Sequence, residues 1–531
     1  MNRPPDKDRI TPSYRPAQAP KQAPCQQSCL NCGDIRGWIA LVAQRDRLGL
    51  SRDDAFARAW EVIADVNPFP ATLGRICPHP CESACNRGSK DEPLAINAME
   101  RFLGDFAVRS DLPLPKTDTK KRQESIGVVG AGPSGLSFAY QMARRGYAVT
   151  VYDARDEPGG MLRYGVPPFR LPKEVLEAEI QKILDLGVQL VPGVSIGKDL
   201  EFETLRSRHD CLYLGVGAQR GRALDLPGAA GPGVITATSY LERVNQGELP
   251  DLGNRVIVIG GGNSAMDAAR SARRGGAAVT IMYRRALDHM PASQSEIEEA
   301  SEEGVELMLL VSPTRFERDD EGCLQALHVA RMGLGDTDAS GRPKPVLREG
   351  TEERVAADTV ILAISQHPVL EGLDGVAQEG DWLLTDRHGA VDQWIFAGGD
   401  AVNPGMAGSA IVQGRHAAER LHQKLAGLEV DPAIPEIRLT NAGQVLQDCK
   451  QASTAARAIS TDVEQRLLHP GSEVSNTLDE QAFLQEVERC FSCGSCFGCE
   501  SCYMYCTAGC FSRVVEVGPG AYFSLNLDSC Q

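Results

Sequence analysis

The sequence has 531 residues, enough for three or four domains, and a formal net charge of −16. A chain this acidic is expected to bind neither nucleic acid nor anionic membrane surfaces. It contains no apolar run long enough to cross a bilayer and no apolar core of a signal peptide at its N-terminus, so we expect a cytoplasmic protein without membrane insertion.

The chain begins with a proline-rich stretch and a first group of cysteines. Residues 1–24 are expected to form a disordered arm. Residues 25–120 predict a small helical domain, because apolar residues recur at helical spacing between positions 34 and 66. Thiolates are soft ligands that suit iron–sulfur clusters, with zinc as the alternative. The candidate metal ligands here are Cys25, Cys29, Cys32, Cys77, Cys81 and Cys85.

A dinucleotide-binding fingerprint follows at residues 126–136. It predicts a strand, a glycine turn and a helix whose free N–H groups and dipole attract a pyrophosphate. The next strand ends at Asp153, whose carboxylate can accept hydrogen bonds from ribose hydroxyls but would repel a 2′-phosphate. This first site therefore fits FAD or NAD. Its candidate contacts in the turn are Gly130, Gly132, Pro133, Ser134 and Gly135.

A second fingerprint begins at residue 256. The strand after it ends at Arg284 and Arg285, whose guanidinium groups suit a 2′-phosphate. The alternative for this arginine pair is a solvated strand end. The second site therefore fits NADP(H), and the two fingerprints together predict two different bound nucleotides. The candidate contacts in this turn are Gly260, Gly262, Asn263 and Ser264.

A later segment indicates how the two nucleotide domains are nested. Gly399 and Asp400 resemble the Gly-Asp segment of two-dinucleotide flavoprotein reductases, in which the aspartate contacts the FAD ribityl chain. Gly217 lies in a segment that resembles the strand closing the first nucleotide domain. The resemblance implies an α/β fold with nested Rossmann-like domains. The expected order is a first FAD half at 121–250, an NAD(P)H domain at 251–370 and a second FAD half at 371–430.

The C-terminus carries a second, denser group of cysteines. Residues 431–477 are expected to be a linker, and residues 478–531 a ferredoxin-like segment that starts with a helix. Residues 496–506 repeat the C-x2-C-x2-C-x3-C spacing of ferredoxins, although Thr507 replaces the usual proline. With Cys530 the segment has enough thiols for two [4Fe–4S] clusters; it predicts one and leaves the second open. The alternative is a zinc ribbon, which would need two separated cysteine pairs instead of one dense run. The candidate ligands are Cys490, Cys493, Cys496, Cys499, Cys502, Cys506 and Cys510.

Several motifs together resemble one protein family. Residues 67–85 with Glu100, residues 158–173 and residues 283–296 are similar to the small subunit of NADPH-dependent glutamate synthase. They are also similar to the N-terminal part of dihydropyrimidine dehydrogenase and to the large subunit of NADH-dependent ferredoxin–NADP oxidoreductase. The resemblance covers roughly residues 25 to 430.

The resemblance implies two [4Fe–4S] clusters in the N-terminal domain. One ligand set is matched in full, and it consists of Cys29, Cys77, Cys81 and Glu100. For the other cluster, only Cys25 and Cys85 match ligand positions of the family, because the two cysteines expected upstream of Cys25 are missing. Cys32 is an extra thiol that could substitute for one of them. For the whole chain we expect at least two clusters, with three or four left open.

The resemblance also extends the expected flavin site. It implies cofactor contacts at Gly160, Met161, Leu162 and Arg170. Gln294 stands where relatives often place an arginine for the 2′-phosphate, which leaves the preference for NADPH over NADH open, so NAD(H) remains a candidate.

These features predict an FAD-dependent NAD(P)H:acceptor oxidoreductase subunit that exchanges electrons with a partner redox protein or complex. Relatives imply ferredoxin, a 2-oxoacid oxidoreductase, a glutamate synthase large subunit or a sulfur-metabolism reductase as partner, and the direction of electron flow stays open. No catalytic side chain is predicted, because hydride transfer to a flavin needs no acid or base. The alternatives are a glutamate synthase small subunit, a ferredoxin–NADP(H) oxidoreductase and a non-catalytic iron–sulfur scaffold.

Overall fold

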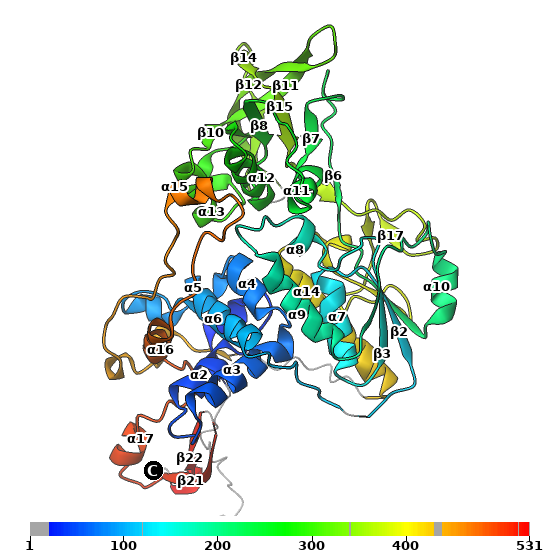
Figure 1. The fold of residues 1–531 in the computed structure, drawn as a ribbon. Helices are drawn as coiled ribbons and strands as arrows, with labels where there is room; N and C mark the ends of the chain where they lie inside the picture. The colour runs from blue at the N-terminus through cyan, green and yellow to red at the C-terminus, as the bar shows by residue number, and fades with distance from the viewer. Residues whose placement is uncertain (1–20, 119, 339–340, 429–437, 519, 530–531) are drawn as a thin grey trace, which may run out of the picture.

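A helical domain, two α/β domains and a C-terminal hairpin make up the part of the chain that the structure describes (Figure 1). The computed structural model describes residues 21–118, 120–338, 341–428, 438–518 and 520–529. Nearly all of the proline-rich arm, and Cys530, lie outside these residues. None of the described helices has both the length and the apolar character that a membrane crossing requires.

The N-terminal domain is helical, as the spacing of its apolar residues predicts. Asp34 caps one helix by accepting a hydrogen bond from the Gly37 N–H. Apolar faces of three helices meet around Phe56, whose ring lies edge-on to Phe102 at a centroid distance of 5.4 Å. The helices are α1 (Pro24–Ser28), α2 (Ile35–Ala43), α3 (Arg52–Val66), α4 (Pro70–Ile76), α5 (Pro80–Ser83), the 3₁₀ turn η1 (Asn86–Ser89) and α6 (Ile96–Arg109).

The first nucleotide domain is built on a five-stranded parallel sheet in the order β19-β5-β2-β3-β4. All four residues of β5 are buried, as expected for a parallel sheet with elements on both faces. Strand β19 comes from beyond the inserted domain, so the predicted nesting of the α/β fold is confirmed. The strands are β2 (Ser125–Val129), β3 (Ala148–Tyr152), β4 (Gln189–Val191), β5 (Cys211–Leu214) and β19 (Ile395–Ala397). The helices are α7 (Pro133–Ala143), α8 (Met161–Tyr164), α9 (Lys173–Leu184), α10 (Phe202–Arg208) and α14 (Ala407–Leu425).

The second nucleotide domain has its own five-stranded parallel sheet, in the order β10-β9-β8-β15-β7. Strand β7 pairs with β15, so this sheet takes in residues 234–236, ahead of the boundary expected at 251. The short β7 carries no fingerprint of its own, and only its pairing assigns it to this sheet. The strands are β7 (Val234–Thr236), β8 (Arg255–Ile259), β9 (Ala278–Tyr283), β10 (Glu306–Leu309) and β15 (Thr359–Leu362). The helices are α11 (Ala237–Asn245), α12 (Asn263–Arg274) and α13 (Gln294–Glu302).

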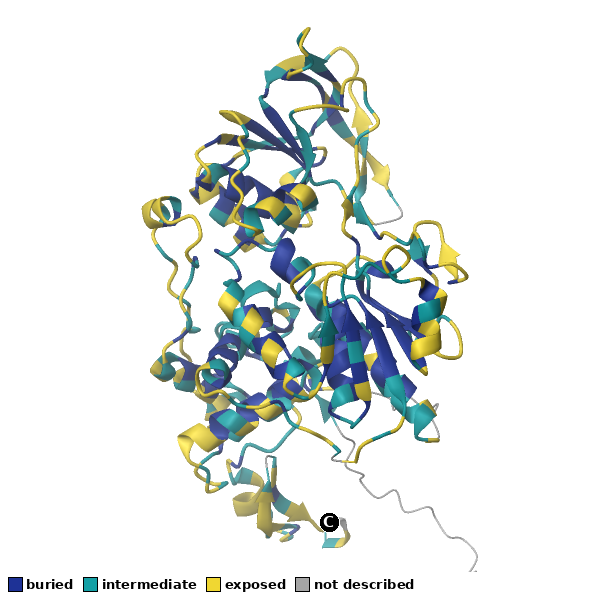
Figure 2. Cartoon of the chain, turned by 45° about the vertical axis from the view of Figure 1, so that its right-hand side comes forward, coloured by how far each residue is buried: buried dark blue, intermediate teal, exposed yellow. Residues whose placement is uncertain are grey.

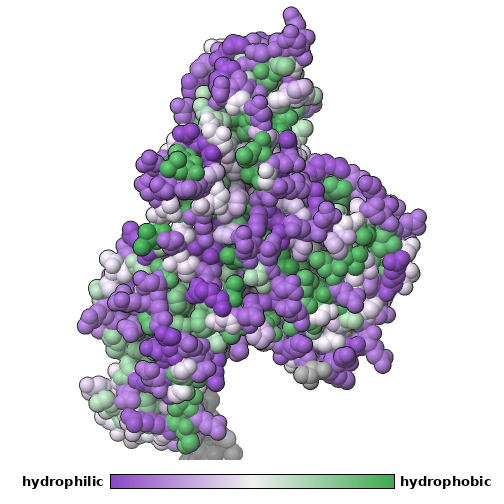
Figure 3. Space-filling model, viewed as in Figure 1, coloured by the Kyte–Doolittle hydropathy of each residue, from purple (hydrophilic) through white to green (hydrophobic). Residues whose placement is uncertain are grey.

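An antiparallel sheet extends the second domain away from the rest of the molecule, at the top of Figure 1. Hydrophilic residues cover much of it on the face shown in Figure 3, in keeping with the acidic composition. Its strands are β11 (Val311–Arg318), β12 (Leu324–Thr337), β13 (Pro343–Leu347) and β14 (Glu353–Ala356). Two further antiparallel pairs consist of two-residue strands: β6 (Arg220–Gly221) pairs with β16 (Gln366–His367), and β17 (Gln378–Glu379) pairs with β18 (Trp382–Leu383).

The C-terminal part runs back along the molecule to the helical domain. Strand β20 (Arg438–Leu439) pairs with β1 (Lys21–Gln22), α15 (Val463–Leu468) contacts α12, and α16 (Glu480–Arg489) packs against α2 and α6. The described part of residues 431–477, the segment expected to be a linker, starts at residue 438, includes the docked helix α15 and leads into the docked helix α16. The chain then forms α17 (Ser501–Tyr505) and the hairpin of β21 (Phe511–Gly518) and β22 (Ala521–Leu525). This hairpin is largely exposed (Figure 2).

Candidate functional site

A cavity of about 180 Å³ lies where the helical domain and both nucleotide domains meet. Each domain contributes a predicted site residue to its wall. The helical domain provides Cys77, the first glycine turn Pro133, the second Asn263, and the return segment Asp400. Motifs that are distant in the sequence thus line one cavity.

The first glycine turn has room for a ligand. Gly130 has a φ of +100°, and a Cβ there would lie 2.3 Å from the Gly215 carbonyl oxygen, so the turn itself requires glycine. A Cβ on Gly132, in contrast, would find no atom closer than the Gly160 Cα at 3.9 Å. The space beside Gly132 thus fits a pyrophosphate at the start of α7, where free N–H groups point outward. Pro133, Ser134 and Gly135 form the first turn of that helix.

Asp153 lies at the end of β3, beside this turn. Its carboxylate accepts hydrogen bonds from the N–H groups of Ala131, at 2.6 Å, and Arg155, at 2.8 Å. Burial raises the pKa of Asp153, while these two N–H groups and the Arg155 charge act in the opposite direction. The carboxylate thus fixes the turn, in the place where the sequence predicts a ribose contact.

The second glycine turn has the same open space. A Cβ on Gly262 would find only the Pro291 Cγ, at 3.9 Å, and the Asn263 side chain accepts a hydrogen bond from the Ser293 N–H at 3.0 Å. The two arginines after β9 differ. Arg284 is exposed, whereas Arg285 is buried and its Nη2 lies 2.5 Å from Oδ2 of Asp338, which directly follows β12 of the antiparallel sheet. Arg284 is therefore the arginine that is open to a ligand.

The return segment closes the cavity on the side of the first sheet. Asp400 lies in the turn η3 (Gly399–Ala401), just before α14, and accepts a hydrogen bond from the Gly405 N–H at 3.0 Å. Burial raises the pKa of its carboxyl group. Met161 and Leu162 of α8 line the same cavity, whereas Gly217 follows β5 and does not. Gly160 immediately precedes α8, and its Cα faces the Gly132 turn.

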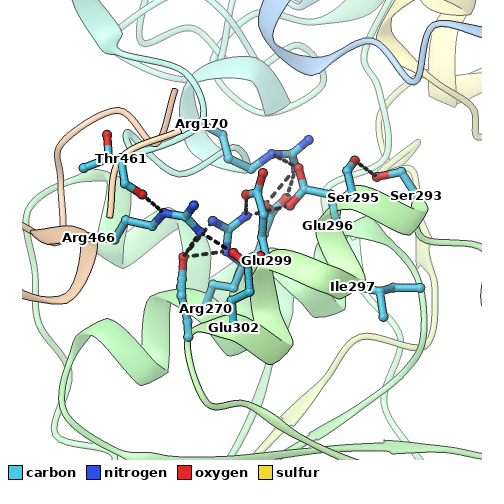
Figure 4. Close-up of polar contacts among 12 residues, drawn as sticks. Arg170, Arg270, Ser293, Ser295, Glu296, Ile297, Glu299, Glu302, Thr461 and Arg466 are labelled. Atoms are coloured by element: carbon cyan, nitrogen blue, oxygen red, sulfur yellow. Dashed lines mark hydrogen bonds and ion pairs between the residues drawn. The ribbon is translucent and has the colours of Figure 1, made fainter. Parts of the chain in front are cut away.

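Arg170 also lines the cavity, but its guanidinium group is bound to the second nucleotide domain (Figure 4). Its Nη1 lies 2.8 Å from Asp267 Oδ1, and its Nε lies 2.8 Å from Glu296 Oε1. Glu296 is shared with Arg270, at 2.9 Å. This buried ion-pair network was not apparent from the sequence, because its members come from two helices and from one loop that is far from them in the chain. The predicted contact of Arg170 with flavin stays a prediction.

The four candidate ligands Cys29, Cys77, Cys81 and Glu100 lie near one another in the helical domain. Burial raises the pKa values of Cys29, Cys77 and Cys81, to about 12 for Cys77, and the nearby Glu100 charge raises them further. Burial also raises the pKa of Glu100 to about 7, against a hydrogen bond from Asn67 Nδ2 at 2.9 Å. A bound cation would offset the cost of gathering these groups as anions. The donor set therefore fits an iron–sulfur cluster, and one of its members, Cys77, lines the cavity.

The other cysteines fall into separate places. Cys25 and Cys85 line a second cavity together with Cys490 and Cys493, whereas Cys32 is exposed and is not part of that lining. Cys496 lies near Cys499 and Cys502, and the Cys510 N–H donates to the Cys506 Sγ at 3.4 Å. Cys449, which no sequence motif singled out, forms a hydrogen bond with Cys499. Across the described residues, no three His, Cys, Asp or Glu side chains meet in the geometry of a single metal ion.

Two protein-family models match the chain. Residues 124–417 match the pyridine nucleotide-disulphide oxidoreductases, and residues 9–112 match dihydropyrimidine dehydrogenase domain II, a 4Fe–4S cluster domain. These matches confirm the predicted flavoprotein fold and iron–sulfur chemistry at the N-terminus, in place of zinc.

Individual relatives agree with these matches. The NADP(+)-dependent formate dehydrogenase subunit beta of Moorella thermoacetica is 34% identical, over 72% of this chain and 59% of its own length. The glutamate synthase [NADPH] small chain of Azospirillum brasilense is 35% identical, over 71% of this chain and 83% of its own length. The chain thus spans only about three fifths of the Moorella protein. The structure of Mycobacterium tuberculosis FprA in complex with NADPH superposes with a TM-score of 0.52 at 18% identity, covering 70% of this chain and 100% of FprA, and shares the fold.

Proposed function

The chain belongs to the pyridine nucleotide-disulphide oxidoreductases, in the group that resembles the glutamate synthase small subunit. From this premise we propose that it is an FAD-dependent NAD(P)H oxidoreductase subunit that exchanges electrons with a partner redox protein. One observation carries the proposal. A single cavity is bordered by both nucleotide turns and by Cys77, a ligand candidate for a cluster.

Bound FAD supplies the chemistry that links the two ends of the cavity, since it exchanges hydride pairs with a nicotinamide and single electrons with a cluster. The chain's own residues orient the reactants. The helix starts behind Gly132 and Gly262 hold the two pyrophosphates, Asp153 holds the first ribose, and Arg284 holds the 2′-phosphate of the second nucleotide. Cys29, Cys77, Cys81 and Glu100 hold the cluster nearest the flavin.

The partner is proposed only as a class. The Moorella and Azospirillum relatives carry the names of subunits of larger enzymes, which supports a subunit role for this chain. The sequence-based candidates, from ferredoxin to a 2-oxoacid oxidoreductase, all deliver or accept single electrons.

Anaerobic addition of NADPH, and separately of NADH, to the purified chain tests the proposal. We expect the flavin absorbance to bleach and the EPR signal of reduced clusters to rise, with NADPH more effective than NADH. Bound flavin that neither nucleotide bleaches would contradict it.

Matched alanine variants of the two turns sharpen this test. At both Gly132 and Gly262 the protein atom nearest to an added Cβ lies 3.9 Å away. We therefore expect both variants to fold. Gly132→Ala should be purified with little flavin. Gly262→Ala should keep its flavin and need roughly tenfold more NADPH for half-bleaching, about 1.4 kcal/mol of binding free energy. If both variants lose flavin equally, the assignment of one nucleotide to each turn is wrong.

A further inference from the structure

A second cavity is lined by thiols from the two ends of the chain. Cys25 lies in α1 and Cys85 lies just before η1, whereas Cys490 and Cys493 follow α16. The cavity among them is small, about 20 Å³. The rest of the wall is mainly apolar and includes Ile39. Four thiols around one small apolar space are a donor set of soft ligands.

The C-terminal pair is held there by the core of the helical domain. Phe483 of α16 is fully buried, stacks on Phe102 at a centroid distance of 4.2 Å and lies edge-on to Phe56 at 5.3 Å. Val487, one turn further along the helix, is buried in the same core. Helix α16 is thus a structural element of the N-terminal domain, although it follows that domain by several hundred residues.

Buried ion pairs and hydrogen bonds connect the C-terminal end of α16 to the segment that follows Cys85. Arg87 is 1% exposed and donates from Nη1 to the Arg489 carbonyl oxygen at 2.9 Å. Asp91 binds both guanidinium groups, at 2.5 Å from Arg87 and 3.1 Å from Arg489. The Arg87 guanidinium also lies over the Phe491 ring, 4.9 Å from its centroid. The residues on either side of Cys490 therefore cannot move independently of Cys85.

Hydrogen bonds also reach the two C-terminal thiols. The Ser492 N–H donates to the Cys490 Sγ at 3.4 Å, and Asn86 Nδ2 donates to the Cys493 Sγ at 3.4 Å. Arg36 Nη1 donates to the Cys493 carbonyl oxygen at 2.9 Å. Donors directed at sulfur stabilise thiolates that ligate metal and tune the cluster they hold.

We infer that Cys25, Cys85, Cys490 and Cys493 together hold one [4Fe–4S] cluster, completed by the C-terminal segment. The N-terminal domain has two thiols too few for this cluster, because proline-rich sequence stands where a pair upstream of Cys25 would be. Cys490 and Cys493 provide the missing pair from the opposite end of the chain. Each of the four thiols loses its proton when the cluster is assembled.

This ligand set lies directly beside the first one. Cys25 lies in α1 and Cys29 directly follows that helix, and Cys81 and Cys85 are likewise four residues apart at α5, so each short segment gives one thiol to each set. The inferred cluster thus lies between the set that includes Cys77 and the remaining cysteines of the tail. Removal of Cys490 and Cys493 should therefore interrupt electron transfer between the cluster at Cys77 and the remaining cysteines of the tail.

Cysteine variants from both ends test the inference by iron content. We expect Cys25→Ser/Cys85→Ser and Cys490→Ser/Cys493→Ser each to lose about four iron and four sulfide per chain, with the same EPR signal missing from both after dithionite reduction. The quadruple variant should lose no more than either pair. Cys323→Ser, an exposed thiol far from both cavities, serves as the control and should keep all of its iron.

Three results would overturn the inference. The first is additive loss of iron by the two pairs, which would mean two different clusters. The second is a full iron content in the Cys490/Cys493 variant, and the third is zinc at the four thiols in the purified chain. Iron content does not depend on NADPH, so these outcomes are separate from a failure of the proposed oxidoreductase function.

Alkylation of the unmutated protein covers the case of a variant that does not fold. In the anaerobic, iron-loaded chain we expect all four thiols to resist iodoacetamide, and to become reactive together when a chelator removes the iron. Alkylation of Cys490 and Cys493 while Cys25 and Cys85 stay protected would contradict a shared cluster.

Discussion

The first nucleotide domain has two junctions of opposite character. Its junction with the helical domain is a continuous apolar core in which Trp60, Phe69 and Leu73 pack with Ile126 and Leu136 of the first sheet and α7. Its junction with the second nucleotide domain is largely polar. It includes the ion pairs of Arg170 and the salt bridge between Arg155 and Glu242, and the Phe169 ring lies under the guanidinium groups of Arg270 and Arg274. The buried core around α12 stays within residues 237–361. Apolar cores resist relative movement, whereas polar interfaces between domains permit it.

Backbone hydrogen bonds reinforce the apolar junction. Tyr140 donates from its hydroxyl to the Ala64 carbonyl oxygen at 2.8 Å, and Glu179 of α9 accepts from the N–H groups of Ala71 and Thr72 at 2.7 and 2.9 Å. Glu179 thereby caps α4, the helix that leads to Cys77. The two junctions therefore differ in rigidity. The apolar junction fixes the candidate cluster ligands relative to the expected flavin site, whereas ion pairs connect the second nucleotide domain to the first.

The largest effect is expected from Phe69→Ala, which breaks the apolar junction. Phe69 is fully buried, and loss of its ring from a packed core should lower the free energy of unfolding by about 3–5 kcal/mol. In urea, flavin release and loss of cluster absorbance should shift together, because one core serves both domains. Leu249→Ala, at a side chain that is 85% exposed, should change neither transition. Separate transitions, of which only the cluster one moves, would contradict a shared core.

The next effect concerns pH and the cap of α4. Burial raises the pKa of Glu179 from its ordinary value of 4.5 to about 7, against the hydrogen bonds that it accepts. The folded state then holds a proton that the unfolded state releases, so this contribution to stability is complete below pH 4.5 and is lost as the pH rises through about 7. The loss amounts to about 3 kcal/mol.

Glu179→Gln should remove this pH dependence of the unfolding free energy, measured by urea titrations between pH 5 and 8, since glutamine does not titrate. Between pH 5 and pH 8, the unfolding free energy of the wild-type protein should fall further than that of the variant. Equal slopes in the two proteins would rule out Glu179 as the group responsible.

A smaller effect is expected at the ionic junction. Asp267→Asn leaves Arg170 buried with Glu296 as its partner, which should destabilise the contact by about 2 kcal/mol. We expect unchanged flavin content and slower bleaching by NADPH in stopped-flow experiments. Because Asp267 lines the nucleotide cavity and Glu296 does not, Glu296→Gln is the matched control. Slowing in Asp267→Asn alone would indicate a local effect on the nucleotide instead of the junction.

The sequence predicts those features whose residues lie close together or at fixed spacing. Both glycine turns follow from local motifs, the candidate ligands around Cys77 follow from the family resemblance, and the nested order of the domains follows from the order of these motifs along the chain. The strand β7 and the Arg170 network could not be predicted, since pairing and packing of distant segments decide them. The same holds for Cys490 and Cys493, which the spacing assigns to a ferredoxin-like run and the packing of α16 places beside Cys25.

The smallest effect separates the two arginines that follow β9. Both are equally good candidates for a 2′-phosphate by sequence, but Arg284 is exposed while Arg285 is bound to Asp338 and to the Pro343 carbonyl oxygen. Arg284→Ala should therefore raise the KM for NADPH roughly tenfold, about 1.4 kcal/mol, and leave that for NADH unchanged, because only NADPH carries the phosphate. Arg285→Ala should act mainly on the antiparallel sheet and lower the free energy of unfolding. If instead Arg285→Ala alone reduced the discrimination between the two nucleotides, the buried arginine would have to leave Asp338 when NADPH binds, and the second domain would then rearrange around its ligand.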